Sequence, residues 1–272
     1  MTAPSGGPAR VLVLADSLAF HGPERAELLT ESGLYPNVLA RELGARVDVV
    51  ARMGWTARDA WWAMTRDPGV YSVLLPRAAA VVLAVGGMDY LPAVLPTYLR
   101  EGIAYLRPAP LRRAARSAYR RCQPVGARLT RGRWRTLPQR LTDLYLSRCV
   151  YGVRTLHPGV PVIGVLPPPH DAPFYGRVTA GHRPAVAAAR AWGAREGVPM
   201  VDLPGIVAPR LAAGAGNPDG MHWDWPTHAE VGAAVAAAVR AAWTATAPAD
   251  TGPPPESAVG GNEAATRGNM DT

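Results

Sequence analysis

Three residues near opposite ends of the sequence have the types and spacing that nucleophilic catalysis requires. Ser17 closely follows the apolar run VLVLA at 11–15, and Asp219 and His222 lie three residues apart in the string NPDGMHWDWPTH. A carboxylate at this spacing can accept the Nδ1 proton of the imidazole, which fixes the tautomer and leaves Nε2 facing a serine hydroxyl. The sequence therefore offers a nucleophile, a base and an acid that orients the base.

Each of these features also has a plainer explanation. A serine after a strand is often a turn residue or a helix cap. A DxxH string can be a surface turn that carries a solvated histidine. The two features gain weight only if the fold brings them together.

The elements that must do so are strands and helices in alternation. Five short aliphatic runs fit buried parallel strands, and several segments between them repeat apolar residues at helical spacing. The strand runs are 11–15, 46–50, 80–85, 160–166 and 198–203, and the helical segments are 36–44, 56–67, 183–197 and 227–243. This pattern predicts an α/β protein, a three-layer α/β/α sandwich around a five-stranded parallel sheet of flavodoxin-like type. Ser17 then lies at the carboxyl end of the first strand, where open α/β sheets bind ligands.

Two stretches break this alternation. Between Arg100 and Arg140 there are 12 arginines and one acid, Glu101, whereas the rest of the chain has 17 arginines against 20 acids. We expect a helical, arginine-rich insertion over about 91–150 that caps the site, with two or three of its arginines touching ligand and most of them solvated.

The two ends of the chain are poor in residues that can form a core. Pro, Gly and small polar residues dominate the last 25 or so positions, and such a composition cannot bury enough surface to fold. We therefore expect a flexible start over 1–9, one catalytic domain over 10–245 and a disordered tail over 246–272.

Composition excludes several kinds of chemistry. All 29 basic residues are arginine, so a lysine Schiff base and a P-loop lysine are ruled out. Cys122 and Cys149 are too few for a zinc cluster or a disulfide scaffold, and we expect no metal and a reducing compartment. The first apolar run is about six residues long, too short for a signal-peptide core or a membrane span, which favours the cytoplasm and no stable membrane insertion.

Taken together, the motifs resemble the blocks of the GDSL, or SGNH, hydrolase superfamily over roughly residues 10–245. ADSL at 15–18 is similar to the GDSL block with Ala in place of Gly, and the resemblance makes Ser17 the nucleophile. Gly54, after the second strand, matches the glycine whose N–H is an oxyanion donor in that family. GGMD at 86–89 resembles the GxND block, but Met88 stands where the family has an oxyanion-donating Asn.

The departure at Met88 bears directly on activity. A thioether cannot donate a hydrogen bond, and one lost oxyanion donor is typically worth about 3 kcal/mol of transition-state stabilisation. Three interpretations stay open: a neighbouring group such as Asp89 or an insertion residue compensates, the substrate is an activated ester, or the protein is inactive.

Longer strings narrow the resemblance to one branch of the superfamily. RVLVLADSLAF, GWT with a following WW pair, GMDYLPAVLPT and GNPDGMHW are similar to the actinobacterial diglucosylglycerate octanoyltransferases. That resemblance implies transfer of octanoyl from coenzyme A to a hydroxyl of glucosylglycerate, in the formation of methylglucose lipopolysaccharides. It implies small-molecule substrates, acyl-coenzyme A as a co-substrate and no other cofactor.

An octanoyl chain needs an apolar slot, and core packing is the alternative role for each residue that might supply it. The candidates that follow strand ends are Trp55, Trp61, Trp62, Tyr90, Leu91 and Leu95, and Trp223 and Trp225 are expected to border the mouth as well. The remaining histidines are interpreted as structural; His21 is close enough to Ser17 to lie near the mouth, and His228 is expected on the surface of the last helix.

Other functions remain as alternatives. The same residues suit a hydrolase, a lipase or carbohydrate esterase, with water as the acceptor. Met88 also fits a non-catalytic sugar-binding relative. A nucleic-acid-binding module is suggested by the basic insertion, but its aromatic residues are few, chiefly Tyr105, Tyr119 and Trp134, and no recognised motif accompanies them. We therefore expect no nucleic-acid partner.

Overall fold

The computed structural model describes residues 7–246, so the expected tail, apart from residue 246, and most of the expected flexible start lie outside the described residues. All strand pairs in it are parallel, in the order β2-β1-β3-β4-β5. The strands are β1 Arg10–Ala15, β2 Arg46–Ala51, β3 Ala80–Ala84, β4 Val162–Val165 and β5 Met200–Val201. This is the flavodoxin-like order, so the predicted sheet is confirmed.

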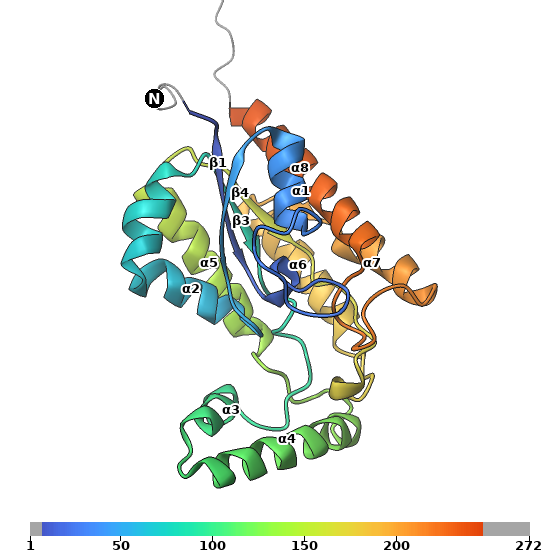
Figure 1. The fold of residues 1–272 in the computed structure, drawn as a ribbon. Helices are drawn as coiled ribbons and strands as arrows, with labels where there is room; N and C mark the ends of the chain where they lie inside the picture. Colours follow the sequence, from blue (N-terminus) through green and yellow to red (C-terminus); the bar gives the residue numbers. More distant parts are fainter. Residues whose placement is uncertain (1–6, 247–272) are drawn as a thin grey trace, which may run out of the picture.

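Helices cover both faces of the sheet, as Figure 1 shows for α2 and α5 on one side and α1 and α8 on the other. Alternate residues of β1 separate the two cores: Val11 and Val13 pack with α1, α7 and α8, whereas Leu12 and Leu14 pack with α2, α5 and α6. The layer helices are α1 Tyr35–Leu43, α2 Ala57–Arg66, α5 Gln139–Leu156, α6 His182–Glu196, α7 Leu203–Ala212 and α8 Trp225–Thr246. Single 3₁₀ turns occur at η1 Ser17–Ala19, η3 Leu75–Arg77, η4 Ile103–Tyr105 and η5 Pro173–Tyr175, and η2 Gly69–Leu74 is a short π-helix.

Local sequence signals set the ends of several helices. Helix α2 begins with a capping box, in which the Asp59 carboxylate accepts from the Thr56 backbone N–H at 2.9 Å. Helix α1 has a proline at its start and ends at Gly44, whose φ of 59° is left-handed. The starts of α1 and α2 bound the loops that follow β1 and β2, which lie at the same edge of the sheet.

Beyond that edge lies a helical cap, which we define as residues 91–138 and which contains α3 Thr97–Gly102 and α4 Ala109–Leu129 (Figure 1). Helix α4 buries little besides Gln123 and Ala127. The Gln123 amide donates to the Pro92 carbonyl at 2.6 Å and accepts from the Val94 N–H at 3.1 Å, which ties α4 to the segment leaving the sheet.

The expected insertion of 91–150 is too long at its C-terminal end. Helix α5 is a layer helix, because its residues Leu146, Cys149, Val150 and Val153 are buried in the core beside α2. Their spacing is that of one helix face, so the apolar stripe, and not the arginine content, marks where the core resumes.

The cap carries much positive charge without internal compensation. Within residues 7–246, none of the 12 arginines between Arg100 and Arg140 lies within 4.0 Å of a carboxylate. The one acid there, Glu101, instead pairs with Arg58 of α2 at 3.2 Å and links the cap to the core. In the described part of the chain, no helix is both long and apolar enough to span a membrane.

Candidate active site

Ser17 lies just after the carboxyl end of β1, an inner strand between β2 and β3, in the first position of η1. The preceding Asp16 caps this turn, since its carboxylate accepts from the Leu18 N–H at 3.0 Å. Burial raises the pKa of Asp16 to about 6, although the Leu18 hydrogen bond opposes this shift. Strand β1 and the Asp16 hydrogen bond together fix the direction of the Ser17 hydroxyl.

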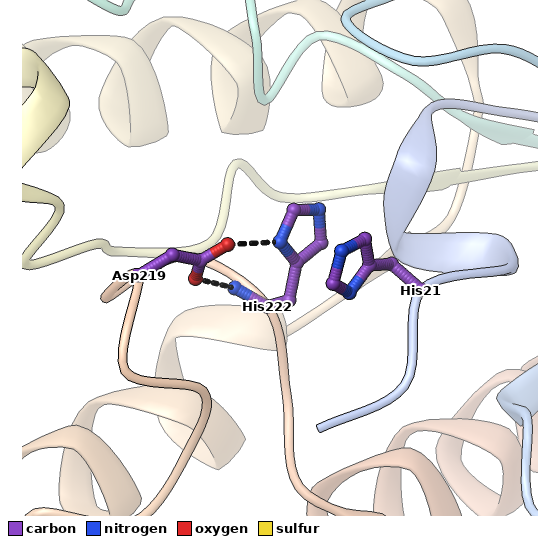
Figure 2. A group of neighbouring side chains, drawn as sticks. All are labelled: His21, Asp219 and His222. Carbon is purple, nitrogen blue, oxygen red and sulfur yellow. Dashed lines mark hydrogen bonds and ion pairs between the residues drawn. The ribbon is translucent and has the colours of Figure 1, made fainter. Parts of the chain in front are cut away.

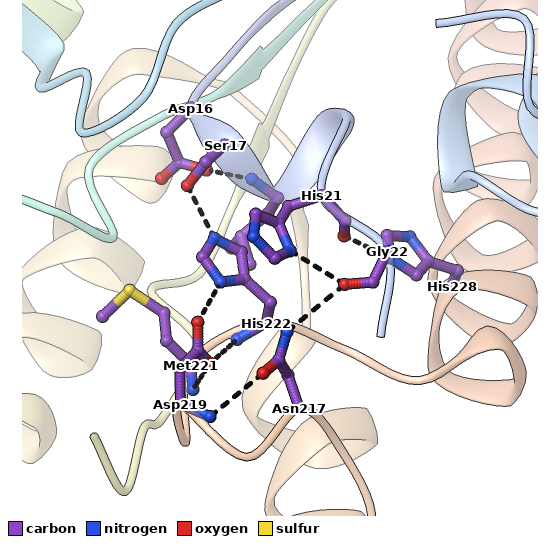
Figure 3. Close-up of polar contacts among 10 residues, drawn as sticks. Asp16, Ser17, His21, Gly22, Asn217, Asp219, Met221, His222 and His228 are labelled. Carbon is purple, nitrogen blue, oxygen red and sulfur yellow. Dashed lines mark hydrogen bonds and ion pairs between the residues drawn. The ribbon is translucent and has the colours of Figure 1, made fainter. Parts of the chain in front are cut away.

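Asp219 and His222 lie on the loop between α7 and α8. One Asp219 oxygen lies 2.6 Å from His222 Nδ1, and the other accepts the backbone N–H groups of Met221 and His222 at 2.9 and 3.1 Å (Figures 2 and 3). The loop packs so closely that a Cβ on Gly220, whose φ is 70°, would lie 2.4 Å from the Asp171 carbonyl oxygen. This loop therefore requires glycine between the two side chains.

The fold brings the two predicted halves of the site together. His222 Nε2 lies 3.0 Å from Ser17 Oγ, across 205 residues of sequence (Figure 3). Since Asp219 accepts the Nδ1 proton, Nε2 is left to accept the proton of the serine hydroxyl. This is the geometry of a serine nucleophile, a general base and an orienting carboxylate.

The electrostatics of Asp219 suit that arrangement. Partial burial alone raises its pKa, but the hydrogen bonds from the His222 ring and from the N–H groups of His222 and Met221 outweigh burial and hold the pKa well below its usual value. Asp219 is therefore ionised at neutral pH. It can stabilise the imidazolium that forms when His222 takes a proton.

A second imidazole, His21, packs directly on the first. Its ring lies parallel to that of His222 (Figure 2), with 3.6 Å between centroids and 12° between planes. Its Nδ1 donates to the Gly22 carbonyl at 2.8 Å (Figure 3). Burial lowers the pKa of His21, so its neutral ring does not repel a charged His222. Sequence reasoning placed His21 near the mouth but assigned it no part in orienting the base; its position four residues after Ser17 was the available signal.

The three residues of this cluster, His21, Asp219 and His222, offer ligand atoms within 4.8 Å of one another. Both Asp219 oxygens, both His222 nitrogens and His21 Nδ1 are, however, already engaged in the hydrogen bonds just described, and parallel rings do not direct two lone pairs at one point. The arrangement suits proton transfer better than metal binding, and the absence of a metal stays a prediction.

Two backbone N–H groups, those of Ser17 and Gly54, are candidates to bind an oxyanion. Gly54 lies in the β2–α2 loop with a φ of 73° and lines the same cavity as Ser17. In the described part of the chain, neither backbone N–H has an acceptor. Met88 is 7% exposed, and its methyl group lies 3.8 Å from the position a Cβ on Gly54 would take. The Met88 thioether therefore lies beside the Gly54 backbone.

Asp89 does not compensate for the missing asparagine, which corrects that interpretation. Its carboxylate is buried and accepts the Ala57 N–H at 3.2 Å, at the N-terminus of α2, and it does not line the catalytic cavity. Burial raises the pKa of Asp89 to about 7, against the opposing effect of the Ala57 hydrogen bond. Its role is to hold α2 and the loop that carries Gly54.

A cavity of about 900 Å³ opens above Ser17 and His222, between the core and the cap. The cap contributes arginines to its wall, namely Arg100, Arg116 and Arg120, and the β2–α2 loop adds Arg52. Of the expected aromatic residues, Trp55 and Trp62 line this cavity. Others belong elsewhere: Trp61 and Trp223 pack in the two cores, Tyr90 and Leu91 are buried beside the site, and Trp225 packs over Gly22 and Gly33.

His228 is buried, contrary to the expectation that it lies on the surface of α8. Its Nδ1 accepts from the Tyr35 backbone N–H at 3.3 Å, and its Nε2 donates to the His21 carbonyl at 3.0 Å. Burial lowers the pKa of His228 to about 4, so the neutral ring bridges α1 and the segment that carries His21. His228 thus supports the active-site loop from behind.

Comparison with known proteins agrees with this geometry. The profile of the GDSL-like Lipase/Acylhydrolase family matches residues 16–231. The diglucosylglycerate octanoyltransferase of Mycobacterium tuberculosis is 41% identical over 231 residues, which cover 85% of this chain and 92% of the relative. The enzyme of the same name from Mycolicibacterium hassiacum is 41% identical over 227 residues, covering 84% and 93%.

Solved structures share the fold at low sequence identity. A lipase/acylhydrolase from Enterococcus faecalis has a TM-score of 0.56 at 14% identity, covering 86% of this chain and 96% of that one. A carbohydrate acetylesterase from Sinorhizobium meliloti has a TM-score of 0.55 at 16% identity, covering 86% and 99%. Profile, relatives and fold agree with the sequence blocks, and the chain belongs to the GDSL-like lipase/acylhydrolase family of enzymes.

Proposed function

We propose that this protein transfers an octanoyl group from its coenzyme A thioester to a hydroxyl of diglucosylglycerate, through an acyl-enzyme on Ser17. The observation that carries the proposal is the hydrogen-bonded series Ser17, His222 and Asp219 at the base of a cavity roofed by a basic cap. The names of the two relatives at 41% identity supply the acyl group and the acceptor.

The first half-reaction acylates the enzyme. Ser17 Oγ attacks the thioester carbonyl while His222 Nε2 takes its proton, and Asp219 stabilises the resulting imidazolium. The oxyanion rests on the N–H groups of Ser17 and Gly54. Collapse of this intermediate breaks the C–S bond, and His222 returns the proton to the departing thiol.

The second half-reaction repeats these roles with the sugar. A hydroxyl oxygen attacks the acyl carbonyl as His222 takes its proton, the C–O bond to Ser17 breaks, and the proton passes back to Ser17 Oγ. A thioester is a more reactive donor than an oxygen ester, so an oxyanion site with two backbone donors and Met88 in place of asparagine suits this chemistry.

The cap supports the choice of donor. Coenzyme A carries several phosphate charges, and Arg100, Arg116 and Arg120 line the cavity without a carboxylate partner within the described residues. Guanidinium groups bind phosphate bidentately. With coenzyme A as the carrier, we also place the reaction in the cytoplasm.

For transfer, the acceptor must outcompete water, whose concentration is about 55 M. The enzyme must therefore bind the acceptor next to the acyl group and limit the access of water to it. Hydrolysis is the alternative, because the same three residues would serve it equally. The rate of thiol release with and without acceptor separates the two reactions.

The test is mass spectrometry of the protein after incubation with octanoyl-coenzyme A. We expect an octanoyl adduct on Ser17 that diglucosylglycerate discharges, with thiol release accelerated by the acceptor and no adduct on Ser17→Ala. Equal thiol release with and without acceptor, with free octanoate as product, would show a hydrolase instead.

A further inference from the structure

One side of the catalytic cavity is apolar, and its residues belong to a single packed cluster. Met88 and Tyr175 are both 7% exposed and lie within this cluster, and Phe174 and Met221 pack against it. All four line the cavity that holds Ser17. The rings of Phe174 and Tyr175 meet edge to face, with 5.0 Å between centroids. These four residues form what we call the thioether wall.

The rest of the cavity has a mixed chemistry. Charged residues from the β2–α2 region and the cap line it beside apolar and aromatic ones; the charged residues are Arg52, Asp59, Arg100, Glu101, Arg116 and Arg120, and the others include Met53, Trp55, Trp62, Ile103, Ala104, Tyr105 and Tyr119. An alkyl chain placed among the charged groups would displace their water without replacing its hydrogen bonds. The thioether wall contains no charged residue, so it is a favourable surface for the carbons of an alkyl chain nearest Ser17.

The wall also reaches the reacting atoms. Met221 immediately precedes His222 in the loop that carries the base (Figure 3). Met88 lies beside Gly54 on the oxyanion side. An acyl chain attached to Ser17 Oγ therefore leaves the reaction centre between two methionines.

Behind these methionines there is space into which their side chains can move. A small hollow of about 20 Å³ lies there and is lined by Met88, Met221, Tyr90 and Leu91 together with Ser17. Methionine side chains are unbranched and fill irregular spaces adaptably. Rotation of either thioether would extend the slot into this hollow.

We propose that the thioether wall is the acyl-chain subsite and that Met88 is a specificity-determining residue within it. At a position where the family places a hydrogen-bond donor, this chain has an apolar contact for the first carbons of the acyl chain. The enzyme thereby gives up one oxyanion donor and gains selectivity for a medium-length chain. The inference rests on the acyl transfer proposed above. It assigns the part of the site that selects the length of the acyl chain.

The experiment measures kcat/KM for thiol release from N-acetylcysteamine thioesters with acyl chains from acetyl to decanoyl. These donors carry no phosphate, so the cap arginines do not enter the comparison. Burial of each methylene predicts about a fourfold gain per carbon, equivalent to about 0.8 kcal/mol, up to the octanoyl donor. We expect Met88→Asn to reduce this gain to about twofold or less, whereas Met88→Leu keeps the full gain.

The matched control is Met53→Asn. Met53 lies on the rim of the same cavity and is 59% exposed, so the same change of residue there should leave the gain per methylene unaltered. If Met88→Asn fails to fold, a second variant tests the same wall. Phe174→Ser replaces a half-buried residue of the wall and should also reduce the gain in kcat/KM per methylene. Thermal melting identifies which variants are folded.

A second measurement does not depend on turnover. Calorimetric binding of octanoate to the Ser17→Ala protein should weaken about tenfold when Met88→Asn is added. A gain per methylene in folded Met88→Asn and Phe174→Ser equal to that of the wild type would overturn the inference. A steep wild-type series without transfer to diglucosylglycerate would defeat the proposed acceptor but leave the acyl subsite standing.

Discussion

Replacing Arg116 and Arg120 with glutamine removes two positive charges from the cavity wall at helix α4. Both side chains are exposed, so each contact with a phosphate is screened by water. At about 4 Å in a medium of high dielectric constant, such a contact is worth about 1 kcal/mol. The double variant should therefore lose about 2 kcal/mol of donor binding, which corresponds to a rise of about 30-fold in KM for octanoyl-coenzyme A.

The assay compares two donors with the same acyl group. Octanoyl-coenzyme A carries the phosphates, and octanoyl-N-acetylcysteamine does not, so only the first should show the rise in KM. Added salt should raise KM for octanoyl-coenzyme A in the wild type and have less effect in the double variant. The reason is that dissolved ions screen exposed charges, with a screening length of about 10 Å at 0.1 M salt.

The matched control is the pair Arg113→Gln and Arg121→Gln. These arginines are exposed on the same helix but do not line the cavity, so the control changes the net charge equally. The reasoning is refuted if both pairs raise KM alike, or if the neutral donor is affected as strongly as the charged one. Tight retardation of duplex DNA at physiological salt would instead favour a nucleic-acid partner for the cap.

Three further predictions concern the core of the site. Ser17→Ala and His222→Ala should each abolish turnover with an unchanged thermal melt, whereas Asp219→Asn should be severely impaired but retain residual activity, since the base remains without its orienting carboxylate; normal turnover by Ser17→Ala contradicts the assignment. Because burial raises the pKa of Asp89 to about 7, its ionisation destabilises the fold, so wild-type stability relative to Asp89→Asn should fall as pH rises from about 4 to 7 and stay level above that; a difference in thermal unfolding that does not vary with pH contradicts it. His228→Leu should lower the free energy of unfolding in urea by about 2–4 kcal/mol, since it leaves the buried Tyr35 N–H and the partly buried His21 carbonyl unpaired. A change below 1 kcal/mol would show that these bonds are dispensable.

Much of the fold follows from local sequence patterns. Five aliphatic runs and the helical periodicity between them predict the sheet, and the motifs containing Ser17 and His222 predict which loops meet at its edge. These features are readable because strand burial and helix amphipathicity leave regular spacing in the sequence. The expected end of the insertion at about 150 is wrong, because arginine content does not mark where the core resumes, whereas the apolar stripe of α5 does.

The misplaced residues depend on contacts that are remote in sequence. His228 looks exposed on its own helix, but its two ring nitrogens bond backbone groups 193 and 207 residues away. Trp61 and Trp62 are adjacent, yet one packs in the core and the other lines the cavity. Which of the two lines the cavity depends on which side of α2 faces the cap. The sequence of α2 alone does not contain that information.

The ring of His21 stacked on His222 has a consequence for the order of events in the site. A two-step transfer uses one imidazole four times, twice to accept a proton and twice to return it, while thiol and sugar exchange places above it. Between these steps the cavity loses one ligand and gains another, and an unsupported side chain would be free to rotate. A flat, uncharged neighbour 3.6 Å away restrains the base through that exchange without competing for its proton. The stack therefore preserves the alignment set in the first half-reaction for use in the second.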